Sequence, residues 1–290
     1  MSALLLVALC LGAGVVARRF LEPAALSGYV LYVALPALAV GKLHQLGSVP
    51  WLGVGCVWLV FGGAWGGYTL AGRAFGLSRA TVACLVLLTG LCNTSFLGFP
   101  LLEALVGPQA IPLALPLDQL GSFLLTCTLA PLVVAHARGA GLELRAPLGA
   151  ILRFPGFWAM LLGLALRGVA VPEAIDGALD RIGATLSPVA LVAVGAQLAW
   201  PRARDAGLVA VGLGYKLLIA PALVLGVLML AEQPHDATFR VTLLECAMAP
   251  MVTGAMLAVR ADLRPDLAQT LLAVGMPLSL ATVWAWAQLG

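Results

Sequence analysis

The chain alternates between long apolar stretches and short polar segments, and most of the stretches are long enough to cross a lipid bilayer. A hydrocarbon layer of about 30 Å needs roughly 20 apolar residues in a helix. The pattern therefore predicts an all-α membrane protein with ten transmembrane helices. The expected spans are Ser2–Ala17, Ala24–Leu43, Trp51–Gly72, Ala80–Leu102, Ala110–Ala137, Pro147–Arg167, Ile175–Trp200, Ala206–Leu230, Thr238–Val259 and Asp266–Gln288.

Two of these spans, the fourth and the ninth, are interrupted at matching places. Leu87–Gly98 reads LLTGLCNTSFLG and Leu243–Gly254 reads LLECAMAPMVTG, and the two align without a gap. Each places polar or helix-breaking residues in mid-membrane, where an unpaired backbone group surrounded by lipid is costly. Matched breaks in two halves of a chain indicate the substrate site of a secondary transporter. The alternative is a pair of kinked helices that use proline and glycine only for packing.

Composition supports a bilayer location and excludes some classes of function. Of the 290 residues 62% are hydrophobic and 10% are charged, whereas charged residues make up about a quarter of a soluble domain. A net charge of +3 gives no support for nucleic-acid binding through a continuous basic face. The six cysteines lie in apolar stretches without metal-ligand spacing, and no catalytic constellation or cofactor motif is apparent. We therefore expect no enzyme and no metal cofactor.

The basic residues predict how the chain is oriented. Eleven of them follow odd-numbered spans and four follow even-numbered spans. Because cytoplasmic loops carry the excess of lysine and arginine, both termini should lie outside the cell or, for a bacterial inner membrane, in the periplasm. Five helices per half would then make the halves inverted repeats. We expect a first repeat over 1–137, a short cytoplasmic linker over 138–146 and a second repeat over 147–290.

Four motifs in order carry a resemblance to a known family. They are Asn93–Leu102 (NTSFLGFPLL), Leu117–Leu125 (LDQLGSFLL), Tyr215–Leu223 (YKLLIAPAL) and Glu245–Ala258 (ECAMAPMVTGAMLA). The chain resembles the auxin efflux carrier family, and its short central loop is similar to that of bacterial malate-permease-like members. The resemblance implies ten helices in two inverted five-helix repeats, with broken helices four and nine crossing at the substrate site. It also implies a fold similar to that of bile acid sodium symporters, in which helices one, two, six and seven form a scaffold beside a moving core.

The expected substrate is a small organic anion, such as a mono- or dicarboxylate or an auxin-like acid. The start of a helix carries about half a positive charge, so two half-helix starts that point at one spot favour a carboxylate. Asn93, Thr94 and Ser95 would donate to it, and Gly98 and Gly254 would let the two backbones cross closely. The residues expected to line the site are Asn93, Thr94, Ser95, Gly98, Ala249, Pro250, Met251 and Thr253.

Three charged residues within the spans are candidates for coupling or gating. Glu245, one turn before Pro250, is open to three roles: a sodium ligand, a proton carrier, or a structural acid with a donor elsewhere. Asp118, beside Gln119 in helix five, is expected to act as a partner or gate rather than to contact an anion. Lys216 either snorkels to the headgroups or is a counter-ion for Asp118, Glu245 or the substrate.

These patterns favour an elevator-type secondary carrier but leave alternatives open. A sodium-coupled symporter of the bile acid type, or a channel or sensor on the same fold, would share the same breaks. Glycines at positions 62, 63, 66 and 67 form small-xxx-small pairs on helix three. Packing within the fold is their expected use, and a homodimer through that face is the alternative.

Overall fold

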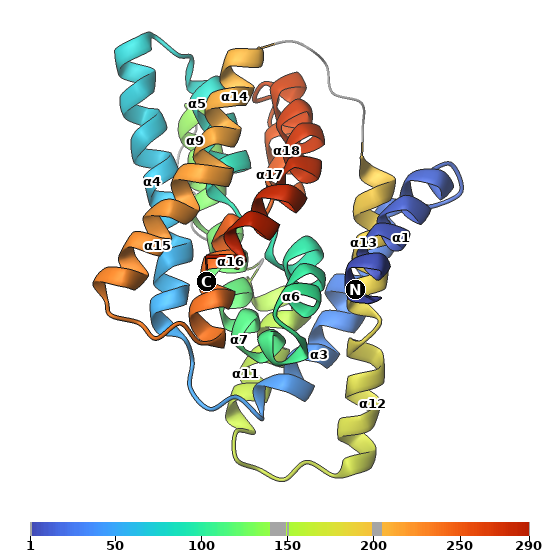
Figure 1. The fold of residues 1–290 in the computed structure, drawn as a ribbon. Helices are drawn as coiled ribbons and strands as arrows, with labels where there is room; N and C mark the ends of the chain where they lie inside the picture. Colours follow the sequence, from blue (N-terminus) through green and yellow to red (C-terminus); the bar gives the residue numbers. More distant parts are fainter. Residues whose placement is uncertain (1, 140–148, 150, 199–204, 290) are drawn as a thin grey trace.

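The computed structural model describes residues 2–139, 149, 151–198 and 205–289, and within these ranges the chain is all-helical (Figure 1). Six helices of the described chain are long and apolar enough to cross a membrane, which confirms the predicted class. They are Pro23–Leu43, Trp51–Phe75, Pro108–Arg138, Glu173–Gln197, Ala206–Leu230 and Pro265–Trp286. Each of the six overlaps a predicted span. The other four predicted spans are shorter, divided or partly outside the described residues, so a count of ten stays a prediction.

The elements follow the predicted spans closely, with several spans divided into shorter helices. In chain order they are α1 (Ser2–Ala17), α2 (Pro23–Tyr29), η1 (Val30–Ala34), α3 (Leu35–Leu43), α4 (Trp51–Phe75), α5 (Arg79–Gly90), η2 (Thr94–Gly98), α6 (Phe99–Leu105), η3 (Pro108–Ala110), α7 (Ile111–Pro116), η4 (Leu117–Phe123), α8 (Leu124–Cys127), α9 (Leu129–Arg138), α11 (Pro155–Ala165), α12 (Glu173–Gly183), α13 (Leu186–Gln197), α14 (Ala206–Gly214), η5 (Tyr215–Ile219), α15 (Ala220–Leu230), α16 (Ala237–Ala247), α17 (Val252–Arg260) and α18 (Pro265–Trp286). Most of the predicted linker, 140–146, and the start of the sixth span lie outside the described residues.

The first, second, sixth and seventh spans pack on one another. α1 runs along α13, and α11 and α12 both pack on α3 (Figure 1). Glycine permits the α1–α13 contact, because a Cβ atom at Gly14 would lie 2.3 Å from the carbonyl oxygen of Val192, and one at Gly195 would lie 2.2 Å from that of Leu11. We call this group the scaffold. It consists of the same four spans that the family resemblance assigns to a scaffold.

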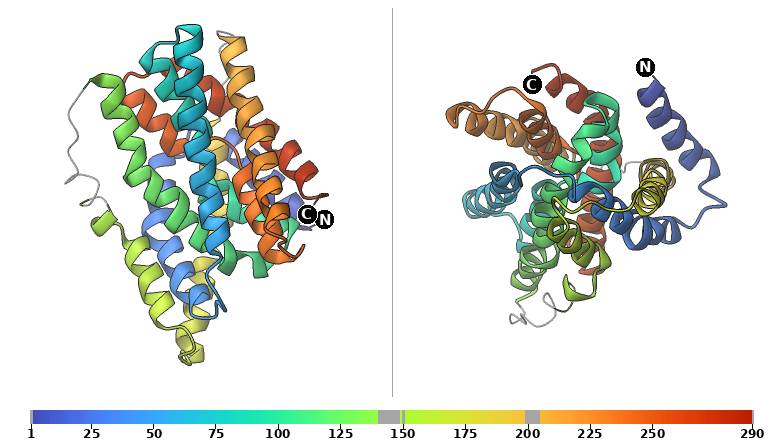
Figure 2. Two further views of the ribbon diagram at one scale, coloured as in Figure 1. Left: turned by 90° about the vertical axis from the view of Figure 1, so that its left-hand side faces the viewer. Right: turned by 90° about the horizontal axis from the view of Figure 1, so that it is seen from below.

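The remaining helices form a second group, which we call the core. α4 packs on α5, α16 and η4, while α17 packs between α5 and α18. The two further views show α4, α9 and the long α14–α15 helix side by side on one face (Figure 2). The two groups meet where α13 contacts η2 and α6. The broken fourth span therefore lies against the scaffold.

Four of the elements are single π-helical turns, η1, η2, η4 and η5, each continuous with an α-helix. A π-helical turn holds one extra residue and often occurs at functional sites. The sequence pattern gave no indication of these turns, because hydrophobic periodicity does not distinguish one widened turn within an apolar helix.

Candidate functional site

The two predicted breaks meet in the middle of the core. α5 ends at Gly90 and η2 begins at Thr94, while α16 ends at Ala247 and α17 begins at Val252. Between these helix ends the two segments run antiparallel for one bridge, Cys92 to Pro250. The amide N–H of Asn93 donates to the carbonyl oxygen of Ala249 over 3.1 Å. Both segments are thus non-helical where the sequence predicts it, and each satisfies part of the other's backbone.

The helices before and after each break differ in N-terminal capping. We call the starts of α5 and α16 the outer starts and those of η2 and α17, at the breaks, the inner starts. Ser78 caps α5 by accepting from the N–H of Thr81 over 3.1 Å, and Asp236 caps α16 by accepting from the N–H of Phe239 over 3.0 Å. The inner starts, at Thr94 and Val252, have no side-chain cap within the described chain. An uncapped helix start keeps free N–H groups and a partial positive charge. Two such starts lie on either side of the Asn93–Ala249 hydrogen bond.

Asn93 occupies the position just before η2 and is almost completely buried, with 1% of its surface exposed. Its side-chain nitrogen Nδ2 has no hydrogen-bond partner among the described residues. A buried amide group without a partner costs free energy unless something else accepts its hydrogens. Asn93 therefore supplies a donor at the junction of the two inner helix starts.

Asp118, on η4, is the centre of a buried hydrogen-bond cluster. The hydroxyl groups of Thr94 and Ser95 both donate to Asp118 Oδ1, and the side-chain amide of Gln119 donates to Oδ2 over 2.7 Å. All four side chains are buried. The hydroxyls of Thr94 and Ser95, which we expected to face a substrate, are in this structure held by a carboxylate of the fifth span.

Glu245, on α16, is fully buried, yet neither of its carboxyl oxygens has a hydrogen-bond partner in the described part of the chain. It lies against Gly98, where an added Cβ would come within 2.6 Å of Glu245 Oε2. We expected Gly98 to let the two backbones cross closely. Instead it makes room for the carboxyl group of Glu245. Gly254 does allow the expected close crossing, because a Cβ there would lie 2.4 Å from the carbonyl oxygen of Leu87.

Lys216, on η5, is fully buried, so of its two alternatives the one in which it snorkels to the headgroups is wrong. Its ammonium group lies 2.8 Å from the sulfur of Cys92, beside the bridge between the two breaks. The described residues show no ion pair that joins this lysine to Asp118 or Glu245. The counter-ion role is the alternative that remains for the buried lysine.

Four polar side chains of the site share one backbone feature that the sequence did not reveal. Thr94 and Ser95 lie on η2, Asp118 lies on η4 and Lys216 lies on η5, so three of the four π-helical turns carry them. A widened turn rotates the residues on either side of it and so changes which side chains face inward. Proline near each turn, as at Pro100, is the only sequence signal that accompanies them.

The second break is more open than the first. Met251 and Thr253 are only partly buried, whereas Asn93 to Ser95 are buried. Pro250 packs against Gly275, where a Cβ would lie 2.7 Å from Pro250 Cγ, and the Met251 sulfur accepts from the hydroxyl of Thr126 over 3.5 Å. The start of α17 is therefore the less buried side of the junction.

One contact between the core and the scaffold joins two polar side chains. The hydroxyl of Ser187, on α13, donates to the carboxylate of Glu103, on α6. Nothing along the chain reveals this pairing, because the two residues are 84 positions apart. A metal centre of three or more His, Cys, Asp or Glu side chains is not present among the described residues.

Comparison with known proteins identifies the family. Residues 3–149 and 144–287 match the model of a family described as membrane transport protein. A relative from Methanothermobacter thermautotrophicus, named an uncharacterized transporter, is 29% identical over 275 residues, which are 91% of this chain and 88% of the relative. These matches and the apolar helices indicate an integral membrane transporter rather than an enzyme. The chain belongs to the membrane transport protein family, the auxin efflux carrier family that its four motifs resemble.

Proposed function

We propose that the protein is a secondary carrier of small organic anions, such as mono- or dicarboxylates, which bind where the two inner half-helix starts meet. The observation that carries this proposal is the buried Asn93 amide, whose nitrogen has no partner among the described residues and lies at a junction of two uncapped helix starts. Free N–H groups and partial positive charge at such a junction suit a carboxylate.

In this proposal the residues of the two breaks have different tasks. Asn93 donates to the substrate, and Asp118 holds Thr94 and Ser95 so that the first helix start keeps its direction. The substrate enters past Met251–Thr253, the partly exposed start of α17. Ala249 and Pro250 shape the floor through backbone contacts to Asn93 and Cys92.

The transport movement we propose is a displacement of the core along the scaffold. Ten helices in two inverted repeats would place the crossover in the moving part, at the face that contacts α13. The Ser187–Glu103 hydrogen bond joins the two groups and would have to break in each cycle. We further propose a plasma membrane location with both termini outside, and leave a homodimer as an arrangement for experiment to test.

We propose that Glu245 carries a proton together with the anion. Asp118 receives three hydrogen bonds, as an ionised carboxylate requires, whereas Glu245 receives none within the described chain. A buried carboxylate without donors is costly, which favours a neutral Glu245 in this state. An ionised Glu245 would also repel a carboxylate substrate nearby. Loss of the proton after the substrate leaves would then reset the site.

The test is transport in proteoliposomes with a labelled dicarboxylate such as malate, chosen after a thermal-shift screen of carboxylates. Counterflow of labelled against unlabelled substrate is expected for a carrier, and its absence for every carboxylate that stabilises the protein would indicate a channel or sensor. Glu245→Gln, which keeps a neutral side chain, should retain counterflow but lose accumulation driven by an imposed pH gradient.

The matched control is Glu173→Gln, an exposed acid on α12 whose loss should leave both measurements unchanged. If Glu245→Gln accumulates substrate like the wild type at every pH and sodium concentration, Glu245 has no coupling role. If wild-type accumulation requires a sodium gradient and ignores the pH gradient, the sodium symporter is the correct alternative.

A further inference from the structure

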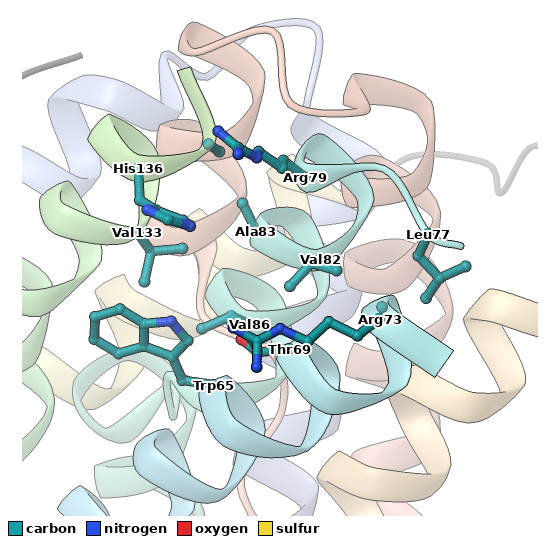
Figure 3. Close-up of a pocket in the computed structure, with 12 residues that line it drawn as sticks. Trp65, Thr69, Arg73, Leu77, Arg79, Val82, Ala83, Val86, Val133 and His136 are labelled. Carbon is teal, nitrogen blue, oxygen red and sulfur yellow. The ribbon is translucent and has the colours of Figure 1, made fainter. Parts of the chain in front are cut away.

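A pocket of about 350 Å³ lies outside the crossover, between α4, α5 and α9 (Figure 3). The residues that line it come from the end of α4, the beginning of α5 and the end of α9. These helix ends belong to the loops with the excess of basic residues, which the charge count assigns to the cytoplasmic side. The pocket takes no part in the transport function proposed above.

The polar end of the pocket is basic. Arg73 from α4, Arg79 from α5 and His136 from α9 enter it from three different helices (Figure 3). No acidic side chain lines it, and in the described residues none of the three side chains has an ion-pair or hydrogen-bond partner. Two arginines and a histidine at one opening suit a phosphate group.

The pocket continues as an apolar groove along α4. A second, shallower pocket shares Trp65 and Thr69 with the first and adds Gly62, Gly66 and Leu70. A Cβ atom at Gly62 or Gly66 would have nothing within 4 Å, so the glycine face is uncovered. From position 73 to position 62 the helix rises roughly 16 Å. The groove thus runs from the basic end to the middle of a membrane-spanning helix.

We propose that this combined pocket and groove is a binding site for an anionic phospholipid of the cytoplasmic leaflet. The phosphate would lie between Arg73, Arg79 and His136, and one acyl chain would lie along Trp65 and the glycine face of α4. A free phosphate would use only the basic end. The apolar continuation toward mid-membrane is what favours a lipid, and anionic lipids are attracted to basic groups at this leaflet.

The experiment uses the whole protein in nanodiscs of phosphatidylcholine with a rising fraction of phosphatidylglycerol that has brominated acyl chains. Bromine quenches tryptophan fluorescence at contact, and Trp65 lies where the pocket and the groove join. We expect saturable quenching at a low fraction of the anionic lipid, with that component absent from Trp65→Phe. Brominated phosphatidylcholine should quench Trp65 only weakly.

Variants test the two ends of the site separately. Arg73→Gln and Arg79→Gln should each raise the lipid fraction for half-quenching by about fivefold, whereas Arg18→Gln, outside the pocket, should not. Gly66→Leu should displace the acyl chain, and Gly67→Leu is its matched control, because a Cβ there also has nothing within 4 Å but Gly67 does not line the groove. Thermal midpoints check that each variant folds.

Two results would overturn the proposal. One is equal half-quenching fractions for the wild type and the double variant Arg73→Gln/Arg79→Gln. The other is displacement of the brominated lipid by soluble glycerol phosphate at the same molar ratio as by unlabelled phosphatidylglycerol, which would assign the site to a free phosphate group.

Discussion

The two breaks that cross in the core have similar sequences and helix ends, but different interactions hold them. The first break is buried, and side-chain hydrogen bonds to Asp118 fix the helix that follows it. The second break has no such cluster in the described chain. Backbone approach of Gly254 to Leu87 and packing of Pro250 on Gly275 hold it, and its helix start is partly exposed.

This difference shows how the two halves of an approximate repeat can have different roles in one site. In the carrier we propose, the half-helix after the first break is held rigidly and Asn93 donates to the substrate. The substrate enters past the start of the half-helix after the second break. Glu245 belongs to the second broken span but packs on Gly98 of the first, so it joins the two. The comparison therefore rests on three interactions, and a single substitution disturbs each. They are the hydrogen bonds to Asp118, the approach of Gly254 to Leu87 and the contact of Gly98 with Glu245.

The largest effect on stability is expected from Asp118→Ala. This change leaves the hydroxyls of Thr94 and Ser95 and the amide of Gln119 as buried donors without their acceptor. Because each unsatisfied donor costs about 1–3 kcal/mol, the free energy of unfolding should fall by about 4 kcal/mol. Denaturant titration of the purified protein in detergent micelles measures this loss.

Two variants show whether the loss comes from the orphaned donors. Asp118→Asn keeps a carbonyl oxygen for the two hydroxyls, and the Gln119 amide can rotate to present its unpartnered Oε1 to the new amide group. It should therefore retain most of the stability. Glu245→Ala removes a carboxyl that accepts no hydrogen bond in the described chain, and should cost less than Asp118→Ala. Equal losses for the two alanine variants would remove the distinction between the breaks.

The second effect in size is expected at the crossing itself, from Gly254→Ala. The new methyl group would lie 2.4 Å from the carbonyl oxygen of Leu87, which belongs to the backbone of α5 and cannot rotate away. Overpacking of this kind costs about 3 kcal/mol. The thermal midpoint and counterflow should both fall. Gly226→Ala, where the methyl group meets nothing within 4 Å, is the control that should leave both unchanged.

Much of this arrangement could be predicted from the chain because it depends on local pattern. Apolar length placed α1 at Ser2–Ala17 and the α14–α15 helix at Ala206–Leu230, the bounds that the structure has. Polar and helix-breaking residues such as Asn93 and Pro250 indicated where the two spans are interrupted, since helix breakers act on their own backbone. That the two breaks meet could be inferred as well, once the halves were taken as inverted.

The partners of the polar side chains could not be predicted in the same way. Thr94 and Ser95 had the composition of an anion site, but which acceptor reaches them depends on how η4 turns Asp118 inward. Lys216 lies within a predicted span, where snorkelling to the headgroups and a counter-ion role were both open. Only the packing of η5 against Cys92 shows that it is buried. Such contacts join spans far apart in sequence, and apolar periodicity carries no information about them.

The smallest effect, and the one that examines the link between the breaks, is expected from Gly98→Ala. The three atoms nearest to its methyl group would all belong to the Glu245 side chain, with Oε2 at 2.6 Å. A flexible side chain can move, so the free energy of unfolding should fall by about 1 kcal/mol.

In a Glu245→Ala background that clash is absent and the methyl group fills part of the cavity, so the same change should be neutral or stabilising. The double-mutant cycle in micelles should therefore give a coupling of about 1 kcal/mol or more. Additive effects would mean that Gly98 and Glu245 do not pack on each other, and the two breaks would then be joined only through the backbone hydrogen bond of Asn93 to Ala249.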